Sequence, residues 1–217
     1  MKLTEKILIG LAILAIVFKF MHLPGGSVLF VIALQLLSII YFLFGFLLFN
    51  GIRFRNIFKK EAYQHASGLR IFGAASAGIT LSTLTTGIMF KLMFWPGAGP
   101  MLVVSLVPSI VILVIALVKF LNSKAIYYRQ VLVRVGIYFI IAVVLFLTGN
   151  LALVKIQYRD APAYVAAWEA LEKDPYNPEL QKKVDLERNR LILSPEDFKQ
   201  YEEYVNSQKS WQQDTTP

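Results

Sequence analysis

Apolar residues run along this chain in five long blocks, separated by short connections that hold most of the charge. The blocks cover residues 5–22, 27–49, 69–94, 101–121 and 132–154. Each is roughly 18 to 26 residues long, enough for a helix rising about 1.5 Å per residue to cross a hydrocarbon core of about 30 Å. The pattern predicts an all-α integral membrane protein with five transmembrane helices.

Two connections are too short for anything but a tight turn. The sequence LPGGS joins the first two blocks, and WPGAG joins the third and fourth. In each, a proline stops one helix and the glycines allow the chain to reverse. We therefore expect a transmembrane hairpin at residues 1–50, a second at 69–122, and a single fifth helix at 132–154.

The other two connections, at residues 51–68 and 123–131, are basic and are predicted to be cytoplasmic loops. Positively charged loops stay in the cytoplasm, so the N-terminus is expected inside the inner membrane and both Pro-Gly turns in the periplasm. The cations are Arg53, Arg55, Lys59, Lys60 and Arg70 in or beside the first loop, and Lys119, Lys124, Arg129 and Arg134 around the second. Arg134 is expected to reach the inner headgroups by its length alone.

Apolar residues alternate with cations in the first basic loop, at IRFRNIFKK. This alternation suits the lipid headgroup region, whereas simple orientation of the neighbouring helices explains the charge as well. A net charge of +8 in a soluble protein would suggest nucleic acid. Here no nucleic-acid partner is expected, because the excess base lies between membrane-spanning blocks.

Residues 155–217 have a different composition, with 9 basic and 12 acidic residues. Asp160 before Pro162, Asn177 before Pro178 and Ser194 before Pro195 are helix-start patterns, with a capping side chain ahead of a first-turn proline. The pattern predicts three short helices in a small soluble tail, which the topology places in the periplasm. Such a tail has a thin core and depends on the membrane domain or a partner for order.

The end of the first block is written again 72 residues later. FKFMHLPGG begins at Phe18 and FKLMFWPGA begins at Phe90, and residues 16–34 match residues 88–106 at eight of nineteen positions. Hydrophobic bias explains matched Ile and Leu, but not a matched lysine, proline and glycine. We infer two copies of one helical hairpin in the same orientation, with the fifth helix added.

The repeated motif resembles the transmembrane hairpin of GldL, the inner-membrane motor subunit of gliding motility and type IX secretion in Bacteroidota. The resemblance covers roughly residues 5–50 and 72–122. It implies that two transmembrane helices assemble around a partner's helix. It also implies that the lysine and histidine of the motif, with a glutamate in the second helix, use the proton gradient.

This chain departs from that pattern in several places. It has the lysine twice, at Lys19 and Lys91, but the histidine only at His22 and the tryptophan only at Trp95. Residues 27–49 and 101–121 contain no acidic residue, so the glutamate is absent. Because a proton-driven device needs a group that changes charge in the membrane, the resemblance implies fold and location more than a motor.

The motif supplies the candidate partner-binding residues, which are Lys19, His22, Pro24, Gly25, Lys91, Trp95, Pro96 and Gly97. For the two lysines, one interpretation is that a four-carbon stem reaches the outer headgroups. The other is that both point into the bundle and bind the carbonyls of the turns or a partner's carboxylate. His22 is expected to hydrogen-bond structurally, with proton sensing as the alternative.

The third block carries small and hydroxyl residues, in GAASAGITLSTLTTG. Ala74, Gly78, Ser82 and Thr86 recur every four residues and form one smooth stripe on a helix. Such a stripe allows close helix packing with hydroxyl bonds, and also self-association. A polar lining for a small solute is the alternative.

These patterns favour a non-enzymatic subunit or scaffold of a cell-envelope complex. The chain has no cysteine, and the membrane region offers no acid cluster, paired histidines or phosphate loop. No catalytic residue, metal or cofactor is therefore expected. The expected partners are the lipid bilayer, other envelope membrane proteins and a second copy of the chain. A small-solute carrier is the alternative function, with a membrane enzyme acting on lipids behind it.

Overall fold

The structure is a computed structural model that describes residues 2–23, 25–52, 54–63 and 67–214. The chain divides into two compact units, residues 1–149 and 150–217, and each is described by itself. In the described residues every regular element is helical, in agreement with the predicted all-α class.

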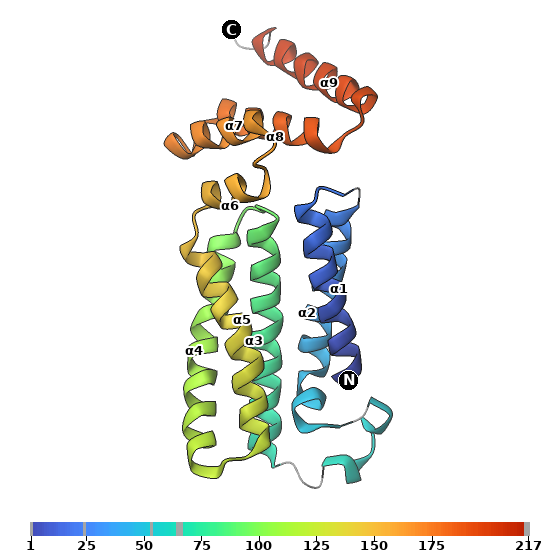
Figure 1. Cartoon of the computed structure of the whole chain (residues 1–217), viewed down its shortest axis with the longest axis vertical. Coiled ribbons are helices and arrows are strands. Elements are labelled where there is room, and N and C mark those ends of the chain that lie inside the picture. Colours follow the sequence, from blue (N-terminus) through green and yellow to red (C-terminus); the bar gives the residue numbers. More distant parts are fainter. Residues whose placement is uncertain (1, 24, 53, 64–66, 215–217) are drawn as a thin grey trace. The chain divides into compact units, whose positions relative to one another are not determined.

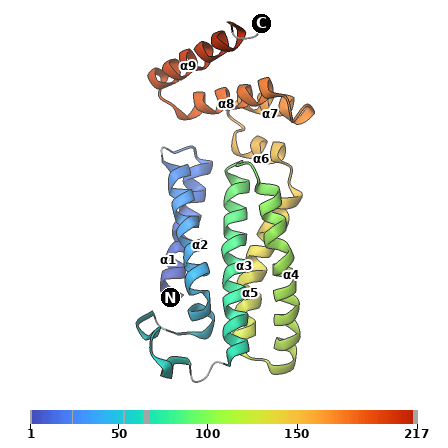
Figure 2. The same cartoon turned by 180° about the vertical axis from the view of Figure 1, so that it is seen from behind.

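The first unit is a bundle of five long helices (Figures 1 and 2). These helices are α1 (Lys2–Phe20), α2 (Gly26–Asn50), α3 (Gly68–Leu92), α4 (Ala98–Ser123) and α5 (Ile126–Leu147). Two short 3-10 turns, Phe54–Asn56 and Lys60–Tyr63, lie in the connection between α2 and α3. The hairpins α1–α2 and α3–α4 pack together through α2 and α3, and α5 packs against α3 and α4.

Four of these helices, α2 to α5, are long and apolar enough to cross a membrane. The chain is therefore a helical membrane protein, as the hydropathy pattern predicts. Helix α1 differs from the others because Glu5, Lys6 and Lys19 lie within its 19 residues. It is also about 9 Å shorter than α2, because it has six fewer residues at about 1.5 Å each.

The fifth helix lies earlier in the chain than the predicted range 132–154. Helix α5 begins at Ile126 and ends at Leu147, because Thr148 adopts an extended conformation with φ −82° and ψ 120°. Residues 150–154 belong instead to a separate short helix in the second unit. The predicted loop 123–131 is correspondingly shortened to the turn around Lys124 and Ala125.

In the second unit, residues 150–214 as described form four helices: α6 (Asn150–Gln157), α7 (Pro162–Lys173), α8 (Pro178–Ile192) and α9 (Pro195–Asp214). An ion pair of 2.7 Å between Lys155 and Glu169 joins α6 to α7. Burial raises the pKa of Tyr158 to about 12, and its ring packs edge-on against Tyr164 with centroids 4.7 Å apart. Helices α7 and α8 pack on one another around buried Val184.

Two of the three predicted helix starts in the tail have the expected cap. Asn177 accepts from the backbone N–H of Glu179 at 3.0 Å, and Ser194 accepts from that of Asp197 at 3.2 Å. Asp160 does not cap its helix, because α7 begins one residue later and has Ala161 at the capping position. The first-turn proline alone marks that start.

Candidate functional site

The two Pro-Gly turns have the same backbone structure as well as similar sequences. His22 and Phe94 occupy the left-handed region, with φ of 52° and 54°. Their backbone N–H groups donate to the backbone carbonyls of Lys19 and Lys91, at 3.2 and 3.3 Å. The remaining backbone hydrogen bonds of the two turns also match. In the first turn, the N–H groups of Met21, Leu23, Gly26 and Leu29 donate to the carbonyls of Val17, Phe18, Leu23 and Gly25, respectively. In the second turn, the N–H groups of Met93, Trp95, Ala98 and Met101 donate to those of Met89, Phe90, Trp95 and Gly97. This is a Schellman-type helix end, repeated at an offset of 72 residues.

Gly25 and Gly97 occupy the second left-handed position in each turn. Their φ angles are 77° and 83°, and each precedes the first residue of the following helix. A residue with a Cβ pays a steric cost in this region, which is why the motif requires glycine. Pro96 is exposed beside Gly97, whereas Pro24 lies outside the described residues.

The repeat extends from the turns into the packing inside each hairpin. Matched positions are fully buried in both copies, as the pairs Phe30 and Leu102, Ala33 and Ser105, and Leu37 and Ser109 illustrate. On the facing helices, Ala15 and Gly87 occupy the equivalent buried positions. A Cβ on Gly87 would lie 3.1 Å from the side chain of Leu102, so this helix pair is already close.

Lys19 and Lys91 lie one helical turn beyond Ala15 and Gly87, on the same buried face. They are only 6% and 8% exposed. A lysine reaching out to headgroups along the outside of the bundle would be largely exposed. This low exposure favours the interpretation in which both lysines point into the bundle, and their binding to turn carbonyls or to a partner's carboxylate stays a prediction.

His22 and Trp95 occupy neighbouring positions of the two turns but differ in their surroundings. His22 is exposed at its left-handed position. Trp95 is half-buried and packs edge-on against Phe90, with ring centroids 5.1 Å apart. The Trp95 ring thus packs the second turn against the end of α3. The first turn has Leu23 at the matching position and therefore lacks this contact between aromatic rings.

The small-residue stripe on α3 is the surface on which α2 packs. Gly78 lies against Gly45, and a Cβ built on Gly78 would lie 2.6 Å from the carbonyl oxygen of Tyr41 and 2.8 Å from the Cα of Gly45. Ala74 is fully buried on the same stripe. The two helices therefore cross at a distance that only glycine permits, which brings their backbones together.

Hydroxyl groups continue this contact toward the middle of the bundle. Ser38 of α2 lies 2.8 Å from the Oγ of Ser82 and 3.0 Å from the Oγ1 of Thr86, both on α3. Thr86 and Thr85 also donate to the carbonyls of Ser82 and Leu81, at 3.0 and 2.7 Å. The Ser38 contacts thus cross between the two helices, whereas the two threonine bonds stay within α3, and the crossing contacts are the arrangement expected of helix packing.

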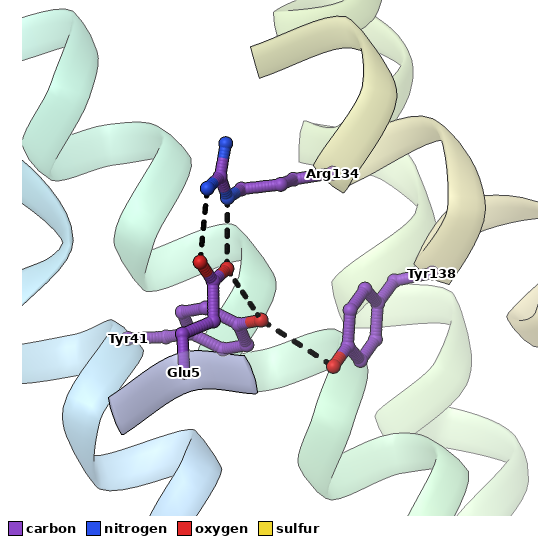
Figure 3. A network of polar contacts seen from close by, with 4 residues as sticks. All are labelled: Glu5, Tyr41, Arg134 and Tyr138. Carbon is purple, nitrogen blue, oxygen red and sulfur yellow. Dashed lines mark hydrogen bonds and ion pairs between the residues drawn. The ribbon is translucent and has the colours of Figure 1, made fainter. Parts of the chain in front are cut away.

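A charged network inside the bundle joins three helices (Figure 3). Arg134 of α5 donates to both carboxylate oxygens of Glu5 of α1, from Nε at 2.7 Å and from Nη2 at 2.9 Å. Tyr41 of α2 donates to Glu5 at 3.1 Å, and its hydroxyl lies 3.4 Å from that of Tyr138. The side chain of Glu5 is 6% exposed and that of Arg134 is 20% exposed.

The depth of this network corrects the prediction for Arg134. Arg134 is eight residues beyond the first residue of α5, and Tyr41 is nine residues before the end of α2. These spacings place Arg134 and Tyr41 about 12 to 14 Å inside the ends of their own helices, whereas Glu5 lies in the first turn of α1. Arg134 does not extend to the headgroups because a carboxylate inside the bundle offers two charge-assisted hydrogen bonds.

The sequence contained a signal for this pair that the predictions did not use. Glu5 and Glu61 are the only acids in residues 1–154, and Arg134 is the single cation within the apolar run that follows Arg129. A lone acid and a lone base buried in separate helices of a membrane protein are each costly, so each is the natural partner of the other.

Fold and site together define a membrane-embedded helical bundle that is built on a repeated hairpin and held by a buried ion pair. Comparison with protein-family models, with curated proteins and with solved structures finds no match for this chain.

Proposed function

We propose that this chain is a non-enzymatic inner-membrane subunit that scaffolds or anchors a cell-envelope complex. It resembles the GldL membrane hairpin in two copies and lacks the glutamate of that hairpin's second helix. In this proposal all five long helices cross the membrane, with the N-terminus in the cytoplasm and the second unit in the periplasm. The chain would work beside other envelope membrane proteins, in the setting of gliding motility and protein secretion in Bacteroidota.

The observation that carries the proposal is the repetition of a buried lysine at a matched position of both hairpins. Lys19 and Lys91 are 6% and 8% exposed, and the carbonyl of each accepts from the left-handed residue of its turn. Burying a lysine in a membrane bundle is costly, so its presence in both copies supports a shared role at the outer rim.

The other polar groups inside the bundle support a structural role for the chain. Glu5 pairs with Arg134, and Ser38 bonds across to Ser82. Each interaction joins two helices and fixes their spacing. Large apolar faces on α1, α4 and α5 remain exposed in the isolated chain, which suits contact with lipid and with partner helices.

Co-purification tests the scaffold proposal directly. The tagged full-length chain is extracted from its native membranes in mild detergent, and the proteins retained are identified by mass spectrometry. We expect a reproducible set of envelope membrane proteins, which a Lys19→Met, Lys91→Met double variant loses while it remains monodisperse. Lys6→Met, at an exposed position of α1, serves as the control. Purification alone, combined with solute uptake into vesicles containing only this protein, would contradict the proposal and support a carrier.

Reporter fusions test the number of spans through parity. Five spans place the two termini on opposite sides of the membrane, whereas four place them on the same side. We expect alkaline phosphatase fused after residue 217 to be active and green fluorescent protein at the same position to be dark. Bright green fluorescence at the C-terminus, with the N-terminus also cytoplasmic, would refute the five-span topology.

A further inference from the structure

The C-terminal end of α2 and the N-terminal ends of α3 and α5 meet at one end of the bundle through an aromatic and cationic cluster. Tyr127 at the start of α5 donates its hydroxyl to the carbonyl of Arg70 at 3.3 Å, and the Arg70 guanidinium lies 4.8 Å from the centre of the Tyr127 ring. Phe49 at the end of α2 packs edge-on against the same ring, at 6.5 Å between centroids. The ends of three helices are therefore tied together.

Exposed cations lie on or beside both connections at this end of the bundle (Figure 1). They are Arg55 and Lys59 on the α2–α3 connection, and Lys119, Lys124 and Arg129 around the α4–α5 turn. The only acid between residues 51 and 134 is Glu61. This end of the bundle therefore presents positive charge with almost no internal compensation.

Large apolar side chains are exposed beside these cations. Phe58 is 96% exposed, Leu69 is 85% exposed, and Phe72 and Ile126 are each 72% exposed. Phe58 directly precedes Lys59 in the α2–α3 connection, whereas Ile126 follows the α4–α5 turn. Alternating exposed rings and cations at a helix end are suited to the boundary between acyl chains and headgroups.

We propose that this end of the bundle binds acidic phospholipid headgroups, with Phe58 inserted at the acyl boundary. The four cations assigned to the headgroup contact are Arg55, Lys59, Lys124 and Arg129. Charge complementarity selects an acidic lipid over a zwitterionic one, and the exposed phenylalanine selects a lipid over a soluble anion. The surface lies on the purified chain itself, so its test is independent of any protein partner.

Native mass spectrometry of the purified full-length chain measures this preference. The protein in mild detergent receives equal amounts of phosphatidylglycerol and phosphatidylcholine with identical acyl chains, and the bound lipids are counted. We expect the wild type to prefer phosphatidylglycerol by roughly tenfold or more, since each cation near a membrane surface contributes about fivefold in affinity. Equal retention of both lipids by the wild type would overturn the proposal.

Matched variants separate the site from general charge. The test variant carries Arg55→Gln, Lys59→Gln, Lys124→Gln and Arg129→Gln, and the control removes four exposed cations of the second unit, Arg159, Lys173, Lys183 and Arg188. We expect the preference to fall to near parity in the first and to remain in the second. Arg55→Lys with Arg129→Lys should retain it, which shows that loss reflects charge and not misfolding. Full displacement of the lipid by excess inorganic phosphate would refute a lipid site.

A spin label tests the position of Phe58. The chain has no cysteine, so Phe58→Cys and Tyr176→Cys each give a single labelling position. In nanodiscs containing phosphatidylglycerol, we expect the label at residue 58 to be accessible to oxygen and shielded from a water-soluble nickel reagent. Tyr176 is 93% exposed between α7 and α8 and serves as the water-accessible control. A label at residue 58 as water-accessible as the one at residue 176 would overturn the insertion.

Discussion

Replacing Glu5 by glutamine is expected to destabilise the membrane bundle. The carboxylate of Glu5 accepts two hydrogen bonds from Arg134 and one from Tyr41. Glutamine has nearly the same size, so packing is retained while the negative charge is lost. The Arg134 guanidinium is then left inside the bundle without a counter-charge.

The magnitude follows from the burial of the two partners. Removing one partner of a fully buried ion pair costs about 3–5 kcal/mol. Because the side chain of Arg134 is 20% exposed, water offsets part of this cost, and the lower end applies. About 3 kcal/mol in a unit of this size corresponds to a fall of roughly 6–12 °C in Tm. The double variant Glu5→Met, Arg134→Met removes both charges and should recover most of the loss.

Thermal stability of the detergent-solubilised protein, followed by fluorescence-detected size exclusion after heating, measures these changes. Glu61→Gln and Lys119→Gln are the matched controls, since both side chains are exposed on the same unit, and neither should shift Tm. If Glu5→Gln matched the wild type, or if the double variant were no more stable than Glu5→Gln, the ion pair would not hold the bundle.

Three further changes test the close helix contact, the turn and the tail. Gly78→Ala should lower the free energy of unfolding by about 1–3 kcal/mol, because the new Cβ would lie 2.6 and 2.8 Å from backbone atoms of α2 and would force α2 and α3 apart. Gly99→Ala, which has open space around its Cβ, is the control in the same melting assay. Gly97→Ala should cost about 1–2 kcal/mol, since φ is 83°, and an unchanged Tm would contradict the left-handed turn. The hydrogen bond from Lys155 lowers the pKa of Glu169 below its ordinary value of 4.5. The stability that this pair contributes is therefore fully present at pH values above 4.5, and it is lost as the pH falls through the lowered pKa of Glu169. Carboxyl NMR titration should show Lys155→Gln restoring the ordinary pKa of Glu169, and a pKa that Lys155→Gln leaves unchanged would contradict the pair.

The helical class and the two turns could be predicted because their signals are local. Long apolar runs define helices, and a proline with glycines at a matched spacing defines a reversal of the chain. The end of α5 was harder to predict, because only Thr148, Gly149 and Asn150 interrupt the apolar run before it resumes at Leu151. The hydropathy of the whole run gave three such residues too little weight, although they mark the observed end of the helix.

The candidate site likewise contains some features that the sequence predicts and others that it does not. A spacing of four along one helix places Ala74, Gly78, Ser82 and Thr86 on one face, and this face does pack on α2. The spacing does not identify Ser38 and Gly45 as the residues opposite. The partner of Glu5 lies 129 residues away, so no local pattern could link it to Arg134. Pairing across a bundle is a property of tertiary packing.

The buried pair also accounts for how α1 can belong to the bundle although it is the most charged of the long helices. Glu5 needs a positive partner inside the bundle, and the one it has is on α5, the last long helix of that unit to be synthesised. Hairpin α1–α2 packs against α3 where Gly45 meets Gly78, and its N-terminal end is also joined to α5 through the pair of Glu5 and Arg134. The fifth helix is therefore more than an appendage to a duplicated hairpin, because it supplies the charge that holds the first copy against the second.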